Sequence, residues 1–213
     1  MVNNAGLDQG RDIYFTSMAH RLQKYLLQWR ARKLCANLDD QIANGDKLLD
    51  LGAGDGYVGK QLMSELGADT TLLDINNNNR TDLPLIIYSG KELPFKDREF
   101  DSVLISYVLH HTVDPVALLK EAKRVTRNKI IILEDVYKSR FDLWIVTLSD
   151  HIMNVFNETK TYGFKREDDW RHIFKSLGLV LVDRKQIRTA LDPVCHLRFT
   201  LRLHTQIQQE PTA

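Results

Sequence analysis

The sequence lacks several features that would assign it to a specialised class of protein. Two cysteines, Cys35 and Cys195, are too few for a disulfide framework or a four-cysteine zinc site. Lysine and arginine number 29 against 28 aspartates and glutamates, so the net charge of +1 gives no overall attraction to a polyanion. No apolar run approaches the roughly 20 residues that span a bilayer, and residues 1–12 lack the apolar core of a signal peptide. We therefore expect a cytoplasmic protein without a membrane span.

What is present is typical of a globular domain. The 213 residues are 43% hydrophobic and 27% charged, which argues against a disordered chain. This length suits about one domain, so residues 1–213 are expected to share one core.

Hydrophobic periodicity predicts strands that alternate with helices. Predicted strands are 47–51, 70–74, 85–88, 100–105, 129–133, 179–187 and 195–203. Predicted helices are 11–43, 57–66, 114–127, 138–157 and 166–177. The Asp114-Pro115 pair marks a helix start, with Asp as N-cap and Pro at the first helical position. The alternation indicates βαβ units and a mostly parallel sheet.

The segment Leu48–Gly56 carries the clearest signal for a ligand. A hydrophobic strand leads into glycines at alternate positions, and a predicted helix follows. Glycines permit backbone angles that other residues disfavour and let a ligand approach the main chain. The helix N-terminus adds free N–H groups and a positive dipole end. Open α/β sheets bind ligands at this place, at the carboxyl ends of strands.

The glycine spacing bears on which ligand this is. The dinucleotide fingerprint requires a third glycine three residues after the second, and Tyr57 stands there. Asp74 ends the next predicted strand, where a carboxylate can accept two hydrogen bonds from a ribose diol. That acid alone does not distinguish NAD from S-adenosylmethionine. The glycine spacing favours S-adenosylmethionine.

Two further motifs extend the pattern. Leu93–Val103 reads L-P-F-K-D-R-E-F-D-S-V, and Val108–His111 reads V-L-H-H. With the glycine segment, these motifs make residues 48–125 resemble the class I S-adenosylmethionine-dependent methyltransferases. The resemblance is greatest to the small-molecule group that includes the ubiquinone and menaquinone methyltransferases. It implies a Rossmann-like, doubly wound α/β fold: seven strands, mostly parallel with the last antiparallel, and helices on both faces.

The resemblance also implies the cofactor and how it is held. S-adenosyl-L-methionine is the expected cofactor and S-adenosyl-L-homocysteine the product. The chain would divide into a helical lid (1–45), a cofactor-binding core (46–135), a helical substrate cap (136–165) and a closing helix with strands (166–204). Asp74 is expected at the ribose diol, Ile75 beside the adenine and Ser106 under the sulfonium. The residues expected to bind the cofactor are Asp50, Gly52, Ala53, Gly54, Gly56, Asp74, Ile75, Ser89, Gly90 and Ser106.

Two positions depart from the pattern of relatives. Ser89 stands where relatives often have Asp, which leaves the contact to the adenine amine in question. Tyr107 also stands where Asp is frequent.

Methyl transfer from a sulfonium is an in-line displacement, so the protein mainly binds, aligns and excludes water. A base is needed only when the acceptor holds a proton. His111 and Asp135 are the expected catalytic residues. The residues expected to contact the acceptor are Tyr14, His110, Trp144, His151 and His196. No metal is expected, because adjacent histidines at a strand end should point apart.

A small-molecule methyl acceptor is the expected partner, and the chain is expected as a monomer or homodimer without nucleic acid. Two alternatives stay open. An RNA or protein methyltransferase would dock through the basic side chains of residues 21–33 and bind with a steep salt dependence. A non-catalytic S-adenosylmethionine- or partner-binding module would show no turnover. A nicotinamide-dependent dehydrogenase is a more distant third.

Overall fold

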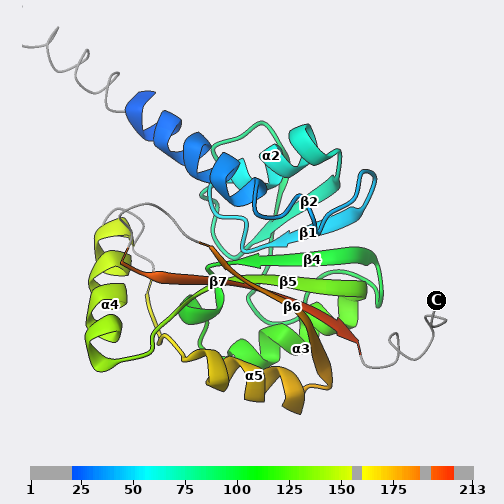
Figure 1. Ribbon diagram of the computed structural model, residues 1–213. Coiled ribbons are helices and arrows are strands. Elements are labelled where there is room, and N and C mark those ends of the chain that lie inside the picture. The colour runs from blue at the N-terminus through cyan, green and yellow to red at the C-terminus, as the bar shows by residue number, and fades with distance from the viewer. Residues whose placement is uncertain (1–20, 155–159, 188–192, 204–213) are drawn as a thin grey trace, which may run out of the picture.

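The computed structural model describes residues 21–154, 160–187 and 193–203. In this part of the chain, seven strands form one sheet in the order β3-β2-β1-β4-β5-β7-β6 (Figure 1). The strands are β1 (Lys47–Leu51), β2 (Asp69–Asp74), β3 (Leu85–Ile87), β4 (Phe100–Ser106), β5 (Thr126–Val136), β6 (Leu179–Ile187) and β7 (Cys195–Leu203).

The strand directions confirm the predicted doubly wound sheet. Strands β1 to β5 pair in parallel, and β7 lies between β5 and β6, antiparallel to both. From the central strand β1, the chain first adds β2 and β3 on one side and then β4 and β5 on the other. This reversal leaves a crevice at the carboxyl ends of β1 and β4, where such sheets bind ligands.

Helices cover both faces of the sheet. The helical segment 21–35 and α2 (Tyr57–Leu66) lie on one face, while α3 (Pro115–Val125) and α5 (Glu167–Ser176) lie on the other (Figure 1). The helix α4 (Arg140–Asn154) stands at one end of the sheet. Side chains of β1 alternate between the faces, so Leu48 packs with the first layer and Leu49 with the second. No helix among the described residues is long and apolar enough to cross a membrane.

Local signals predicted several helix ends correctly. The helix 57–66 has the predicted bounds. At the start of α3, the Asp114 carboxylate accepts a hydrogen bond of 2.9 Å from Ala117 N, as its N-cap role requires. This helix ends at Val125, and β5 begins at Thr126, three residues earlier than predicted. The predicted strand began too far along the chain, because residues 126–128 are polar and an apolar pattern does not include them.

The prediction of one helix over 11–43 is wrong at its C-terminal end. The helix stops at residue 35, and residues 36–41 form turns. The Asn37 side chain donates to Lys33 O, and Arg198 donates to the Asn37 carbonyl and to the Asp40 carboxylate. Asn and Asp favour such local contacts over helix interiors. The bonds from Arg198 join this turn to β7, which is about 160 residues away in the sequence, and a local pattern cannot reveal them.

Packing of β7 against α5 predicts a large cost for truncating Phe199. Its side chain is fully buried, and its ring meets Phe174 edge-on at a centroid distance of 5.4 Å. Phe199→Ala should lower the free energy of unfolding by about 3–5 kcal/mol, measured by urea denaturation. The control Val182→Ala, at a position that is 45% exposed on β6, should cost less than about 1 kcal/mol. Equal costs for the two variants would contradict this packing.

Candidate functional site

A cleft of about 1840 Å³ opens at the carboxyl ends of the central strands. Its walls include the helical segment 21–35, the glycine loop after β1, the loop after β2, the 3-10 helix η1 (Leu109–His111), and one side of α4. Asp135 near the end of β5 and His196 near the start of β7 also line it. A pocket for one small ligand typically measures ~300–1,000 Å³. The cleft therefore has room for more than one ligand.

The glycine loop adopts the backbone that its spacing predicts. Gly52 and Gly54 have φ of +81° and +55°, a region that other residues rarely adopt. A Cβ added to Gly52 would lie 2.4 Å from Val108, so only glycine fits there. A Cβ on Gly54 would meet nothing within 4 Å. The main chain at Gly54 is thus directly accessible from the cleft.

Asp74 fixes this loop from the neighbouring strand. Its carboxylate accepts hydrogen bonds from Gly54 N at 2.8 Å and from Asn76 N at 2.9 Å. A carboxylate has about four acceptor positions, so each oxygen retains capacity for another donor. Asp74 lines the cleft together with Ile75 and Gly90, and the side chain of Ile75 is 54% exposed. The cleft wall here combines an acceptor with an apolar surface.

Asp50 lies behind the loop in the protein interior. It is 1% exposed, and its Oδ2 atom has no hydrogen-bond partner among the described residues. Burial, together with the charges of Asp55 and Asp74, raises the pKa of Asp50 to about 7. Its carboxyl receives a backbone hydrogen bond from Gly59 of α2 and does not line the cleft.

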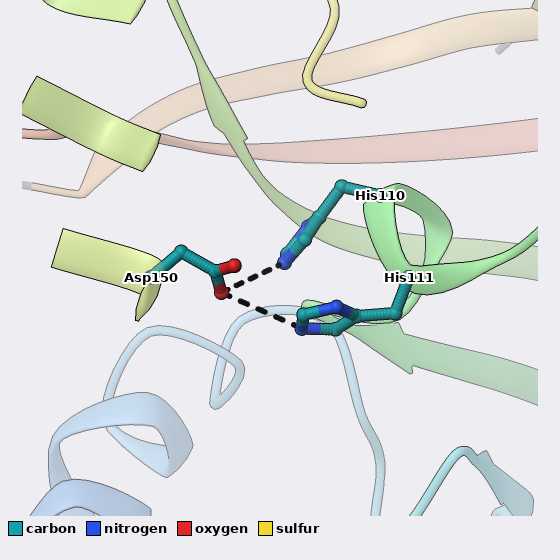
Figure 2. A group of neighbouring side chains, drawn as sticks. All are labelled: His110, His111 and Asp150. Atoms are coloured by element: carbon teal, nitrogen blue, oxygen red, sulfur yellow. Dashed lines mark ion pairs between the residues drawn. The ribbon is translucent and has the colours of Figure 1, made fainter. Parts of the chain in front are cut away.

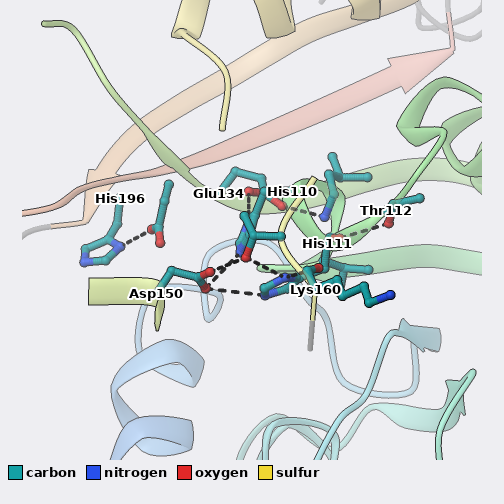
Figure 3. Close-up of polar contacts among 11 residues, drawn as sticks. His110, His111, Thr112, Glu134, Asp150, Lys160 and His196 are labelled. Carbon is teal, nitrogen blue, oxygen red and sulfur yellow. Dashed lines mark hydrogen bonds and ion pairs between the residues drawn. The ribbon is translucent and has the colours of Figure 1, made fainter. Parts of the chain in front are cut away.

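At the end of the cleft away from the glycine loop, a buried carboxylate holds η1. Glu134 is fully buried and accepts hydrogen bonds of 2.7 Å from Leu109 N and from His110 Nδ1 (Figure 3). Burial lowers the pKa of His110, but the charges of Glu134 and Asp150 more than offset this and raise it to about 10. His111 is next to it, with Nδ1 at 3.1 Å from the Lys160 carbonyl. Burial and the charge of His110 lower the pKa of His111.

A second carboxylate–histidine pair lies on the neighbouring strands. Asp135 Oδ1 and His196 Nδ1 are 2.5 Å apart, on adjacent strands β5 and β7. The His196 ring meets Tyr107 edge-on at 5.7 Å. Tyr107 has φ of +56°, which is unusual for a bulky side chain and typical of functional sites. The pair therefore faces the cleft beside a strained backbone position.

The structure brings most of the expected site residues to one cleft. Those that line it are Gly52, Gly54, Asp74, Ile75, Gly90, Ser106, His110, His111, Asp135 and His196. Asp50, Ala53 and Gly56 are buried in or below the loop instead, and Ser89 is exposed outside the lining. Tyr14 lies outside the described residues.

Trp144 and His151, which were expected to contact the acceptor, do not line the cleft. Trp144 is 62% exposed and stacks with Phe141 at a centroid distance of 6.2 Å. Trp144 and His151 are seven residues apart in α4 and so share one side of this helix, which faces outward. Asp150 lies on the side that faces the cleft. The sequence analysis missed it, although a charged residue in an otherwise apolar helical stretch was a signal.

The expectation that His110 and His111 point apart is also wrong. Their ring centroids are 4.1 Å apart, and Figure 2 shows both side chains directed toward Asp150. The expectation assumed the alternation of an extended strand. The two residues instead lie on η1, whose tight turn brings successive side chains closer together.

Comparisons with known proteins agree with this geometry. A family model for a methyltransferase domain matches residues 49–133. The chain is 40% identical over 112 residues to the demethylmenaquinone methyltransferase of Corynebacterium urealyticum, covering 50% of this chain and 47% of that protein. It is 37% identical over 147 residues to the uncharacterized protein MJ1123 of Methanocaldococcus jannaschii, covering 62% of this chain and 71% of that protein. The chain thus spans about half the length of the demethylmenaquinone methyltransferase.

Solved structures share the fold. One is a chain from a complex of the Haloferax volcanii Trm112 methyltransferase activator with a methyltransferase: TM-score 0.66, 17% identity, and coverage of 89% of this chain and 98% of that one. Another is magnesium protoporphyrin IX methyltransferase from Synechocystis PCC 6803 with bound SAH. It has a TM-score of 0.60 and 20% identity, and the match covers 94% of this chain and 95% of that one.

The glycine loop, the acid at the end of β2 and the seven-stranded sheet define a nucleotide-type ligand site on a Rossmann-like fold. With the matches above, the chain belongs to the class I S-adenosylmethionine-dependent methyltransferases. S-adenosylmethionine is the cofactor of this family. The expected family and cofactor are therefore confirmed.

The buried carboxyl of Asp50 predicts a pH-dependent stability difference. Folding raises its pKa from 3.8 to about 7, so its stabilising contribution is complete below pH 3.8 and is lost as the pH rises to about 7. Asparagine has no ionisable carboxyl, so Asp50→Asn does not lose stability in this way. Urea denaturation measures the free energy of unfolding of both proteins. The value for Asp50→Asn minus that for the wild type should rise by a few kcal/mol in total between about pH 4 and about pH 7, and should stay constant at higher pH. The control Asp69→Asn, at an exposed position in β2, should show no such change. A pH-independent difference for Asp50→Asn would contradict the raised pKa.

Proposed function

We propose that this chain transfers the methyl group of S-adenosylmethionine to a small-molecule acceptor. The observation that supports this most is the open main chain at Gly54 beside the carboxylate of Asp74. When bound, the cofactor supplies an activated methyl group on a cationic sulfonium.

The residues present fit this cofactor. The spare acceptor positions of Asp74 suit the two hydroxyls of the ribose, and Ile75 with Gly90 suits one edge of an adenine. The free space at Gly54 suits a group that lies against the main chain. In this proposal Gly52 and Ser106 line the methionine end, while Asp50, Ala53 and Gly56 hold the loop from within.

The acceptor would occupy the rest of the cleft. The relatives named as demethylmenaquinone methyltransferases support a small organic acceptor. The volume of about 1840 Å³ supports a second ligand beside the cofactor. His110 and His111 would contact the acceptor from η1.

The proton of a hydroxyl or acidic-carbon acceptor needs a base in reach. We assign this role to His196, whose Nδ1 is held by Asp135 at 2.5 Å. A carboxylate on one ring nitrogen fixes the tautomer and leaves the other nitrogen as the acceptor. Asp135 is then a positioning residue, and the cleft walls exclude water during the displacement.

A macromolecular acceptor is the second candidate. Trp29, Arg30 and Lys33 of the N-terminal helix line the same cleft, and the Trp29 side chain is 47% exposed. An exposed aromatic side chain among basic ones is a feature of nucleic-acid binding. RNA binding that weakens steeply with salt would favour this candidate, and salt-independent turnover of a small acceptor would exclude it as the main activity.

Cofactor binding is tested by Gly54→Asp. The new carboxylate would fill the open space and face Asp74, so the affinity for S-adenosylhomocysteine should fall by about 100-fold or more, or about 3 kcal/mol. Calorimetric titration measures it. Gly45→Asp is a matched control, because Gly45 also has a positive φ of +81° and nothing within 4 Å of an added Cβ, yet it lies outside the cleft. Equal affinities of the two variants for S-adenosylhomocysteine would show that the glycine loop is not part of the cofactor site.

Proton transfer is tested by His196→Gln and Asp135→Asn. The acceptor is first found by screening phenols, hydroquinones, amines and thiols for S-adenosylhomocysteine formation. With a hydroxyl acceptor, His196→Gln should lower kcat by about 10²–10⁴-fold, and Asp135→Asn should lower it by less. The KM for S-adenosylmethionine should stay unchanged in both, which separates proton transfer from cofactor binding. Full turnover by His196→Gln would refute the assignment.

A further inference from the structure

Three metal-ligand atoms converge where η1 faces α4. His110 Nε2, His111 Nε2 and a carboxylate oxygen of Asp150 all lie within 4.8 Å of one another (Figure 2). We infer that these three residues hold one divalent transition-metal ion. This inference does not rest on the proposed methyl transfer, because ion binding can be measured without cofactor or acceptor.

The hydrogen bonds behind the two rings fix which nitrogen faces Asp150. A carbonyl oxygen only accepts, so the Lys160 carbonyl requires the proton of His111 on Nδ1 and leaves a lone pair on Nε2. Glu134 likewise accepts from His110 Nδ1 and directs its Nε2 toward Asp150. Metal-binding histidines are held in this way, with the second ring nitrogen donating to a carboxylate or a backbone carbonyl.

The distances suit ligands of a shared ion better than direct hydrogen bonds. Asp150 Oδ1 lies 3.7 Å from His110 Nε2 and 3.5 Å from His111 Nε2. Hydrogen bonds between such atoms are about 2.7–3.2 Å long. Two ligands that each lie about 2.1 Å from a tetrahedral ion are about 3.4 Å apart. The Thr161 hydroxyl donates to the other oxygen of Asp150, as ligating carboxylates usually require.

The charges around the three residues also favour a cation. The carboxylates of Glu134 and Asp150 contact the same buried His110 ring from opposite nitrogens. Their side chains are 0% and 10% exposed. In the ion-free protein a proton on His110 offsets part of this negative charge, and a divalent ion bound at Nε2 would replace that proton.

The three ligand atoms determine which ions can bind, and the bound ion would be accessible from the cleft. Two imidazole nitrogens and one carboxylate favour zinc, iron(II), cobalt(II) or nickel(II) over magnesium or calcium, which prefer oxygen ligands. Three protein ligands leave at least one coordination position. All three residues line the cleft, so an oxygen- or sulfur-bearing acceptor could fill that position.

The first experiment measures ion binding by the full-length chain after chelator treatment and without a histidine tag. Equilibrium dialysis should find one Zn²⁺ per chain, Co²⁺ should give a visible absorption band, and excess Mg²⁺ should not displace either. His111→Ala and Asp150→Asn should each weaken Zn²⁺ binding by more than the ~10–100-fold that loss of an outer-shell partner costs. His172→Ala, which removes an exposed histidine from α5, is the control and should bind like the wild type.

A second measurement covers the case that a variant does not fold. X-ray absorption of the zinc-loaded wild type should show two imidazole ligands and light-atom scatterers. No binding by the folded wild type, equal affinity in His111→Ala and Asp150→Asn, or sulfur ligation by Cys35 or Cys195 would each overturn the inference. Calorimetry with S-adenosylhomocysteine on the same samples reports on the cofactor site, so failure of one proposal is distinguishable from failure of the other.

Discussion

The carboxylate of Glu134 is the contact on which the proposed acceptor end of the cleft depends. It is fully buried, and its two oxygens accept from Leu109 N and His110 Nδ1. These bonds join the end of β5 to the turn that follows β4. An unsatisfied buried donor costs about 1–3 kcal/mol, so an apolar residue here would leave two such donors and release η1. The position of the His110 ring therefore follows from one side chain on the neighbouring strand, and η1 brings His111 beside it.

The cofactor end of the cleft depends on local chemistry instead. Gly52 and Gly54 need a positive φ, and Asp74 is the last residue of β2, at the place where it can accept from Gly54 N. These features lie close together in the sequence or at the ends of adjacent parallel strands. The sequence could therefore predict this loop, its acid and the sheet around it.

The acceptor end could be predicted only in part. His110, His111, Asp135 and His196 were recognisable as polar residues at strand ends, and all of them line the cleft. The convergence of the two histidines was missed because it depends on η1 and on Glu134. The role of Asp150 depends on which side of α4 packs inward, and Trp144 and His151 were misplaced for the same reason. Helix orientation is a tertiary property that residue type and spacing leave open.

The place of β7 in the sheet has a consequence for biosynthesis. It is the last of the seven strands to be synthesised, yet it lies between β5 and β6 and pairs with both. Strands β1 to β5 can pair while the ribosome is still adding residues, because their partners are already present. The Asp135–His196 pair forms only when β7 inserts. The order of synthesis thus allows the strands of the nucleotide-binding half to pair first, whereas His196 can reach Asp135 only after β7 has been made.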